Sequence, residues 1–341
     1  MFKDKDFDMQ LAPFVLLLIL PAFAIAQKPH GRTDIPTEDS VKAAGFYSQL
    51  QFRKPEKTAS IGAGPVFLTI SQQSRNRGIL MQFPKGGIVL AKGSDVEPQG
   101  RKMLYFPSKV QVDSTYRFYL ATASDSAENF TLYSGYAFLP ELGKWKLIGT
   151  VKLQGHWGPL KNVSTQAYLK RQTPNAVFSA KAIQRANGSW KQLDTATRNP
   201  SINLASHVDS LDRLQIERAL IRDYVSKDSL KNWQEKEDVH FAILAPGNGR
   251  QVLLTDTVEV FYKGYLFPNG GVFDQTKDKT ARFPLTRLIR GWQIAIPYLR
   301  EGGQVRIIIP SSLAYSIRTR SPKIPPNSIL VFEVEVVRAT Q

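Results

Sequence analysis

The sequence contains no cysteine and only four histidines among its 341 residues. The lack of cysteine excludes disulfide bonds, thiolate metal sites, a cysteine nucleophile and a lipid-modified cysteine. The histidines are isolated and lack the spacing of metal ligands; they are His30, His156, His207 and His240. A Gly-x-Ser-x-Gly motif and a phosphate-binding loop are also missing. We therefore expect neither a metal site nor a cofactor.

Long helical patterns and dense blocks of one charge are scarce as well. Lys and Arg number 45 against 29 Asp and Glu, which gives a formal net charge of +16. Because the basic residues are scattered along the chain, a generally basic solvated surface is favoured over nucleic-acid binding. The frequent glycines, prolines and aromatic residues predict a β-rich protein with many turns.

An apolar run follows a short charged start at the N-terminus. The run is LAPFVLLLIL, residues 11–20, and the small residues Ala24 and Ala26 precede Gln27. This pattern predicts a secretory signal peptide over residues 1–26, although the start MFKDKDFD lacks a positive charge excess. An uncleaved membrane anchor is the alternative. Residues 27–44 are polar and predict a flexible leader.

Residues 45–195 form a succession of short alternating segments, which predict a β-sandwich domain. The segments are FYSQLQF, GPVFLTIS, GILMQF, TYRFYLATA, FTLYSGYAFL and KWKLIGTVKL. Their order is similar to a secreted bacterial domain family of unknown function. Such sandwiches often bind carbohydrate, so some aromatic residues are candidates for stacking on a glycan, with core burial as the alternative. These candidates are Tyr133, Tyr136, Trp145, Trp157 and Trp190.

Residues 206–236 lack the alternating pattern of the preceding segments and predict a helical linker. Apolar residues lie among charged ones from Leu211 to Val225, and Asp209 or Ser210 is placed to cap the start. A second short helix is expected to run through Trp233.

Residues 239–341 contain six spaced motifs in a fixed order. They are Y-x-G-x-L, N-G-G-x-F-D, F-P-L-x-x-L-I-x-G-W, E-G-G, I-P-x-x-L-A-Y and I-P-P-N-S-x-L-x-F. This segment resembles the FKBP-type peptidyl-prolyl isomerase domain. The resemblance implies a twisted antiparallel sheet wrapped around one short helix, so the chain is mostly β with an α+β C-terminal domain. Pro297 should distort the last turn of the short helix.

The resemblance also implies a small apolar pocket for proline. Trp292 would be its floor and Asp274 its single rim carboxylate. The walls would be Tyr262, Phe273, Leu288, Ile289, Tyr315, Ile324 and Phe332. Catalytic roles fall on Asp274, Trp292, Tyr315 and Ile324, since the Tyr315 hydroxyl and the Ile324 backbone N–H would donate to the substrate carbonyl. By pattern alone, these aromatic residues are also compatible with plain core packing.

Two departures from the family pattern concern the loop beside this pocket. Ser316 stands where the family usually has glycine, so it should need a strained backbone or a different path. Residues 317–323, IRTRSPK, are basic and are expected to overhang the pocket.

These features predict an exported prolyl isomerase that assists the folding of envelope or secreted proteins. Its partners would be proline-containing polypeptides, and its location the periplasm or outer envelope of a Gram-negative bacterium. In similar exported proteins the linker helix is a dimerisation or spacer element, so a homodimer and a helix packed on its own domain both remain open. The alternative function is a non-catalytic protein that binds proline-containing peptides and, through the sandwich, glycan.

Overall fold

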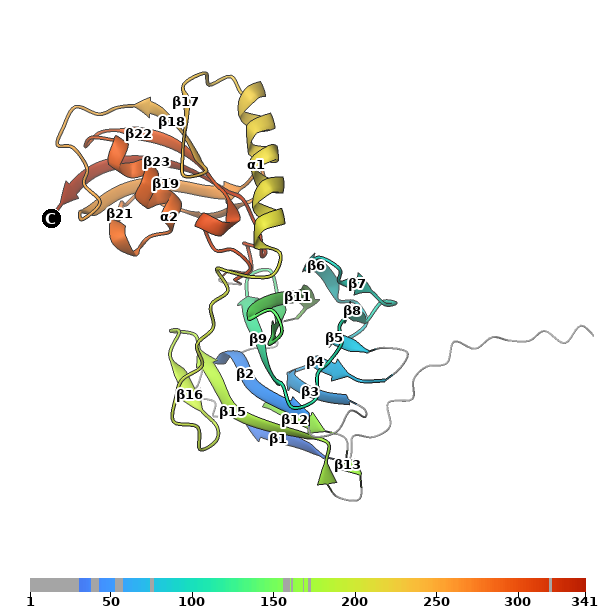
Figure 1. Cartoon of the computed structure of the whole chain (residues 1–341). Helices are drawn as coiled ribbons and strands as arrows, with labels where there is room; N and C mark the ends of the chain where they lie inside the picture. The colour runs from blue at the N-terminus through green and yellow to red at the C-terminus, as the bar shows by residue number, and fades with distance from the viewer. Residues whose placement is uncertain are drawn as a thin grey trace, which may run out of the picture.

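The computed structural model describes residues 31–37, 43–52, 58–73, 77–155, 160, 162–167, 169–170, 173–318 and 321–341. The expected signal peptide, residues 1–26, lies outside these residues. Two antiparallel sheets come first, followed by a helix and a third sheet around short helices (Figure 1). The predicted mostly β fold with an α+β C-terminal domain is thus confirmed. No helix among the described residues is long and apolar enough to cross a membrane.

The first sheet has seven strands, and one of its edges comes from the segment expected to be a flexible leader. Its spatial order is β1 (Arg32–Pro36), β12 (Asn162–Ala167), β3 (Thr58–Ala63), β4 (Val66–Ser71), β5 (Gly78–Gln82), β8 (Met103–Pro107) and β7 (Glu97–Pro98). Strand β1 pairs with β12 from Arg32–Gln166 to Pro36–Asn162. Its side chains are mostly exposed, so backbone pairing, not apolar burial, fixes it at the edge.

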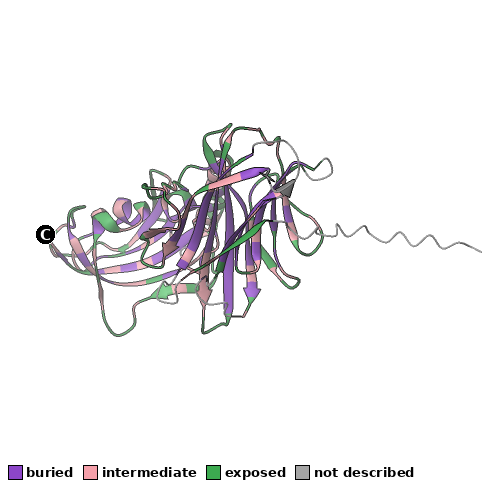
Figure 2. Ribbon diagram, turned by 90° about the horizontal axis from the view of Figure 1, so that it is seen from below, coloured by how far each residue is buried: buried purple, intermediate pink, exposed green. Residues whose placement is uncertain are grey.

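The second sheet packs on the first over a shared core. Its order is β16 (Trp190–Gln192), β15 (Ala176–Arg185), β2 (Ala43–Phe52), β9 (Thr115–Asp125), β10 (Phe130–Leu139), β11 (Lys144–Gln154) and β6 (Ile88–Lys92). Phe46 and Phe118 of this sheet share one buried cluster with Leu68 and Met81 of the first. Figure 2 shows the central strands buried along most of their length. We call residues 32–192 the two-sheet domain; a short hairpin, β13 (Leu169–Lys170) and β14 (Thr173–Pro174), completes it.

The outer face of the second sheet is buried too, by a cluster that we call the aromatic socket. Its buried side chains surround Ile317 of the C-terminal domain; they are Tyr47, Tyr119, Ala121, Tyr136, Trp145, Leu147 and Leu204.

The glycan-stacking prediction is contradicted for three of its residues by their burial. Tyr133 is 1% exposed and lies in the shared core, while Tyr136 and Trp145 are 0% and 3% exposed in the socket. Their ring faces are therefore covered by protein. Trp190 is half-buried against the rings of Tyr47 and Tyr119, and Trp157 lies outside the described residues.

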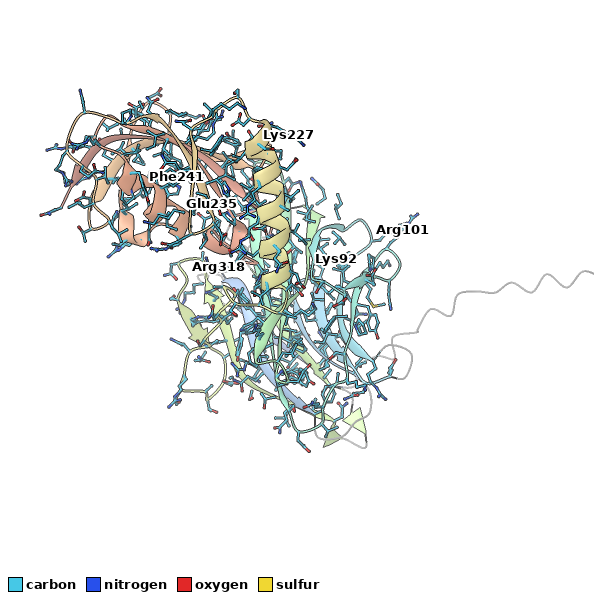
Figure 3. The ribbon with its side chains drawn as sticks, turned by 45° about the horizontal axis from the view of Figure 1, so that its top comes forward. Lys92, Arg101, Lys227, Glu235, Phe241 and Arg318 are labelled. Atoms are coloured by element: carbon cyan, nitrogen blue, oxygen red, sulfur yellow. The ribbon has the colours of Figure 1, made fainter. Side chains whose placement is uncertain are left out.

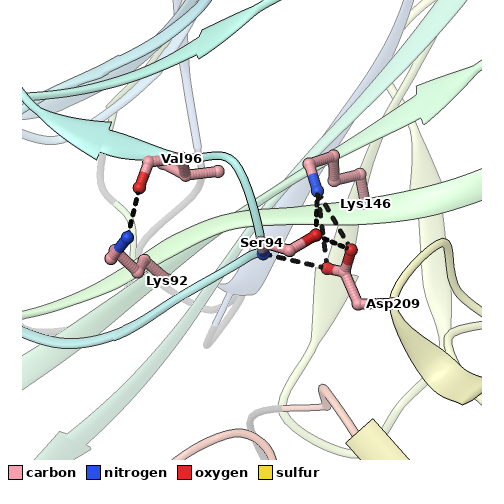
Figure 4. A network of polar contacts seen from close by, with 5 residues as sticks. All are labelled: Lys92, Ser94, Val96, Lys146 and Asp209. Atoms are coloured by element: carbon pink, nitrogen blue, oxygen red, sulfur yellow. Dashed lines mark hydrogen bonds and ion pairs between the residues drawn. The ribbon is translucent and has the colours of Figure 1, made fainter. Parts of the chain in front are cut away.

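The linker contains one helix, α1 (Ser210–Lys227), which stands beside the C-terminal domain (Figure 1). The predicted second helix is wrong, because Trp233–Lys236 forms strand β17, which pairs antiparallel with β18 (Val239–Ala245). Asp209 occupies the N-cap position, but its carboxylate turns to the two-sheet domain. It accepts hydrogen bonds from the Ser94 backbone and hydroxyl and from Lys146 Nζ (Figure 4).

The C-terminal sheet runs in the order β17, β18, β22 (Gln304–Ile309), β23 (Leu330–Thr340), β19 (Thr257–Leu266) and β20 (Val272–Gln275), and β21 (Ala281–Pro284) pairs with β19. Four short helical segments accompany it: η1 (Leu285–Arg287), α2 (Arg290–Ala295), η2 (Ile296–Tyr298) and η3 (Ser311–Leu313). The α-helix gives way to a 3-10 turn at Pro297, as predicted. Gly291 lets α2 approach the sheet, since a Cβ there would lie 2.5 Å from Ile309 Cδ1.

The Asp209 network yields a stability prediction. The Lys146 side chain is 1% exposed, and its Nζ lies 3.2 Å from Asp209 Oδ1. Asp209→Ala leaves a buried cation without its partner, so the free energy of unfolding should fall by about 3–5 kcal/mol. Urea denaturation measures it, with Asp212→Ala in the exposed first turn of α1 as the matched control. An equal loss in both variants would contradict a role for the buried pair.

Candidate functional site

The site is an aromatic cluster built around Trp292, on the first turn of α2. The indole is 3% exposed, and its ring centroid lies 5.3 Å from that of Phe332 on β23 and 5.7 Å from that of Tyr262 on β19. Both rings stand nearly perpendicular to the indole, at 86° and 79°, a favourable arrangement for aromatic pairs. Within the described part of the chain, Trp292 Nε1 has no hydrogen-bond partner, so its surroundings are apolar.

The expected floor and wall residues all belong to the buried core of the C-terminal domain or pack against it, and ring contacts join Trp292 to Tyr262 and Phe332. Trp292, Ile324 and Phe332 belong to the buried core of the C-terminal domain. The half-buried side chains packed against it include Tyr262, Phe273, Leu288, Ile289 and Tyr315. These five side chains keep partly exposed surfaces, whereas Trp292 is almost fully buried.

Asp274 lies at the edge of the cluster with its side chain exposed. It faces Gly264 across the β19–β20 pair, and its Oδ2 accepts a hydrogen bond of 2.6 Å from the Tyr262 hydroxyl. Burial first, and then this bond to a carboxylate, raise the pKa of Tyr262 above its ordinary value. Tyr262 therefore remains a protonated donor at neutral pH, and it holds the carboxylate against the aromatic cluster.

The backbone N–H of Ile324 is already engaged. It donates to the Ser321 carbonyl at 3.1 Å, within an isolated antiparallel bridge between these two residues. The structure therefore does not present the expected free donor, and a substrate carbonyl would have to replace that of Ser321. The Ile324 side chain, 6% exposed, belongs to the buried core of the C-terminal domain.

The loop after η3 contains Tyr315, and its backbone turns away from the C-terminal domain after that residue. Ser316 adopts a φ of 56°, the left-handed conformation that suits glycine at this family position. The next residue, Ile317, is fully buried in the aromatic socket. Arg318 folds back and donates to the Ala314 and Tyr315 carbonyls, each at 3.0 Å, in the region labelled in Figure 3. Within the loop expected to overhang the pocket, Ile317 is instead buried in the aromatic socket, and Thr319 and Arg320 lie outside the described residues.

Sequence reasoning missed several residues next to the site. Phe283 of β21 packs on Trp292, with ring centroids 6.5 Å apart, and its position in the F-P-L motif was a usable signal. Glu217 of α1 is fully buried against Ser311, and Ile317 is buried in the socket. Neither role had a local sequence signal. A glutamate on a helix is usually exposed to solvent, and a buried isoleucine usually packs in the core of its own domain.

Metal binding has no visible basis in this region. Among the residues that the structure describes, no group of three or more His, Cys, Asp or Glu side chains is arranged to hold a metal ion.

Comparisons with known proteins place the C-terminal segment among FKBP-type isomerases. A family model described as FKBP-type peptidyl-prolyl cis-trans isomerase matches residues 249–337. FK506-binding protein 1 of Eremothecium gossypii is 38% identical over 100 residues, which are 28% of this chain and 87% of that protein. The probable FKBP-type isomerase FkpA of Neisseria meningitidis is 36% identical over 122 residues, covering 35% of this chain and 44% of the relative. The crystal structure of FkpA from Escherichia coli aligns with 29% identity and a TM-score of 0.34, over 39% of this chain and 62% of that one.

The chain belongs to the FKBP-type peptidyl-prolyl cis-trans isomerase family through its C-terminal domain. It spans less than half the length of the Neisseria relative and 41% of a probable FKBP-type isomerase of Haemophilus influenzae.

Gly264 gives a test of the packing at this site. A Cβ at this position would lie 2.7 Å from the Phe273 ring and 2.8 Å from the Phe332 ring. Gly264→Ala should therefore lower the free energy of unfolding by roughly 1–3 kcal/mol through overpacking. Gly271→Ala is the control in the adjacent turn, where an added Cβ meets nothing within 4 Å. Thermal unfolding of both variants measures the difference, and equal melting temperatures would contradict the tight contact.

Proposed function

We propose that this chain catalyses cis-trans isomerisation of X-Pro peptide bonds in polypeptides at the aromatic cluster around Trp292. The observation that supports the proposal is a set of contacts inside the segment that the family model matches: the Trp292 ring packs against Tyr262 and Phe332, and the Tyr262 hydroxyl donates to Asp274.

The reaction needs such a surface and little else. Rotation about a peptide bond crosses a barrier of about 18–20 kcal/mol because amide resonance must be broken. The cis and trans forms of an X-Pro bond differ by only about 0.5–1 kcal/mol, so the catalyst changes a rate and not an equilibrium. The twisted transition state has less charge separation than the planar amide. An apolar, water-excluding surface therefore disfavours the planar form relative to the twisted one.

Some of the residues would bind the substrate proline ring, and others would orient its X-Pro amide bond. The proline ring would pack on Trp292 between the half-buried wall side chains, with Phe283 closing one side. The Tyr315 hydroxyl would donate to the substrate carbonyl. Asp274, fixed by Tyr262, would place a negative charge at the edge where the twisted amide turns. The Ile324 N–H would contribute once the substrate carbonyl displaces that of Ser321.

The cellular role that we propose is folding assistance outside the cytoplasm. Support comes from the apolar run and small residues of 1–26, which are typical of an exported chain. Its clients would be proline-containing envelope or secreted proteins, in the periplasm or outer envelope of a Gram-negative bacterium.

One observation favours a second candidate, a non-catalytic protein that grips proline-containing peptides. The Ile324 N–H already donates to the Ser321 carbonyl, so one of the two expected donors to a substrate carbonyl is occupied. Binding at the aromatic cluster does not require that second donor, whereas stabilisation of a rotating amide benefits from it.

Protease-coupled isomerisation of the tetrapeptide Ala-Leu-Pro-Phe, carrying a C-terminal p-nitroanilide that chymotrypsin releases, tests the proposal with the full chain. Asp274→Ala removes the acceptor of the Tyr262 hydroxyl and the rim charge, so kcat/KM should fall by roughly 10- to 100-fold. The matched control is Asp278→Ala, which removes an exposed carboxylate four residues along the chain and should retain the wild-type kcat/KM.

A folded wild-type chain that binds this peptide without accelerating its isomerisation would establish the second candidate. An equal loss in Asp274→Ala and Asp278→Ala would reject the rim carboxylate and leave only a general charge effect.

A further inference from the structure

The loop from Ser311 to Asn327 contains both proposed donors, yet it is held by parts of the chain outside the C-terminal domain. Tyr315 lies in its first third and Ile324 near its end. Contacts from α1 reach both ends, and contacts from the two-sheet domain and its adjoining linker reach the middle.

Helix α1 holds the ends of the loop through one buried carboxylate. Glu217 is fully buried and accepts hydrogen bonds of 2.7 Å from both the amide and the hydroxyl of Ser311. Arg213 pairs with Glu217 at 2.6 Å and also donates to the Asn327 carbonyl at 2.7 Å. One ion pair on α1 therefore fixes the spacing between the two ends of the loop.

The aromatic socket holds the middle of the loop. Ile317 is fully buried there among side chains of the second sheet, and its carbonyl accepts a hydrogen bond from the Tyr136 hydroxyl. Ser316 donates through its hydroxyl to the Leu204 carbonyl at 3.2 Å. These contacts lie one and two residues beyond Tyr315, so they set the direction in which the chain leaves it.

The contacts from α1 and the contacts from the socket are connected, because the start of α1 is itself bonded to the two-sheet domain. The buried Lys146 pairs with Asp209, and the Val208 amide donates to the Trp145 carbonyl at 3.0 Å (Figure 4 shows the Asp209 contacts). Trp145 is also a wall of the socket. The two-sheet domain thus fixes the loop directly through Ile317 and indirectly through α1.

We propose that the two-sheet domain is a positioning element of the isomerase site, and that Ile317 in the aromatic socket aims the Tyr315 hydroxyl at the substrate carbonyl. Ile317 belongs to the socket and not to the Trp292 cluster, so it is a positioning residue and not a catalytic one. A misplacement of about 1 Å at a reacting group can cost on the order of 100-fold in rate, so a side chain outside the site can control it. This inference rests on the proposed function.

The same contacts explain what the aromatic face of the second sheet is for. Tyr136 and Trp145 cover Ile317, so the rings that suggested glycan stacking bind a segment of this chain instead. The ligand of the socket is an aliphatic side chain with a backbone carbonyl beside it.

A double-mutant cycle on the full chain tests the proposal, with Ala-Leu-Pro-Phe as substrate. The proteins are wild type, Ile317→Ala, Tyr315→Phe and the double variant. If Ile317 acts by aiming the Tyr315 hydroxyl, Ile317→Ala should lower kcat/KM about tenfold, with less than about a twofold further loss in the Tyr315→Phe background. Ile317→Val, which still fills most of the socket, should restore kcat/KM to within about twofold of wild type.

The control is Ile183→Ala, the same truncation in the shared core of the two-sheet domain. It should lower the melting temperature, as Ile317→Ala does, but retain the wild-type kcat/KM. The proposal is overturned if Ile317→Ala keeps full activity. It is also overturned if Ile317→Ala loses as much in the Tyr315→Phe background as in wild type, or no more than Ile183→Ala does.

An inactive but folded wild-type chain would instead reject the proposed function. In that case the same four proteins are compared by their affinity for the tetrapeptide, where the positioning inference expects the same non-additive losses. Additive losses of affinity would then reject the positioning role independently of catalysis.

Discussion

A buried carboxylate on α1 constrains the arrangement of the whole C-terminal site. An ionised glutamate removed from water is tolerated only when its oxygens are fully paired, and Glu217 meets this condition with Ser311 and Arg213. These hydrogen bonds are directional, so a rotation or shift of the helix would leave the Glu217 carboxylate buried without partners. The loop that begins at Ser311 is therefore held at both of its ends by a helix outside the isomerase domain.

Most of the C-terminal fold could be predicted because its determinants are local. Residues 257–266 alternate between buried and less buried positions, and the turn at Asn269–Gly271 separates β19 from β20. The cluster around Trp292 followed from motifs in a fixed order. Strands β1 and β17 fell where the sequence predicted a flexible leader and a helix; both lie at sheet edges and are mostly exposed. Such strands are fixed by backbone pairing with a neighbour, which leaves little apolar pattern in the sequence.

The contacts around the site could not be predicted because they join residues that are far apart in the chain. Ser311 is 94 residues from Glu217, and Ile317 is 181 residues from Tyr136. The direction of the Asp209 carboxylate could not be predicted for the same reason, because its partner lies elsewhere in the chain. Its position before α1 predicts a cap, but the buried Lys146 offers a charge partner, and that pairing decides the direction of the carboxylate. An N-cap hydrogen bond stabilises a helix by about 1 kcal/mol, which is less than the cost of leaving a buried cation unpaired.

The aromatic face of the second sheet shows why composition alone misassigns a surface. A sheet whose outer face is polar needs no covering, whereas one that presents Tyr136 and Trp145 must bury them against something. Glycan and protein both satisfy that need, and the sequence of the sheet does not distinguish them. The distinguishing feature lies in the partner loop, where the left-handed Ser316 turns Ile317 outward from the isomerase domain. The full burial of Ile317 in the socket offsets the conformational cost of the left-handed Ser316 beside Tyr315. The backbone conformation next to the site and the aromatic face of the other domain are therefore two halves of one interaction.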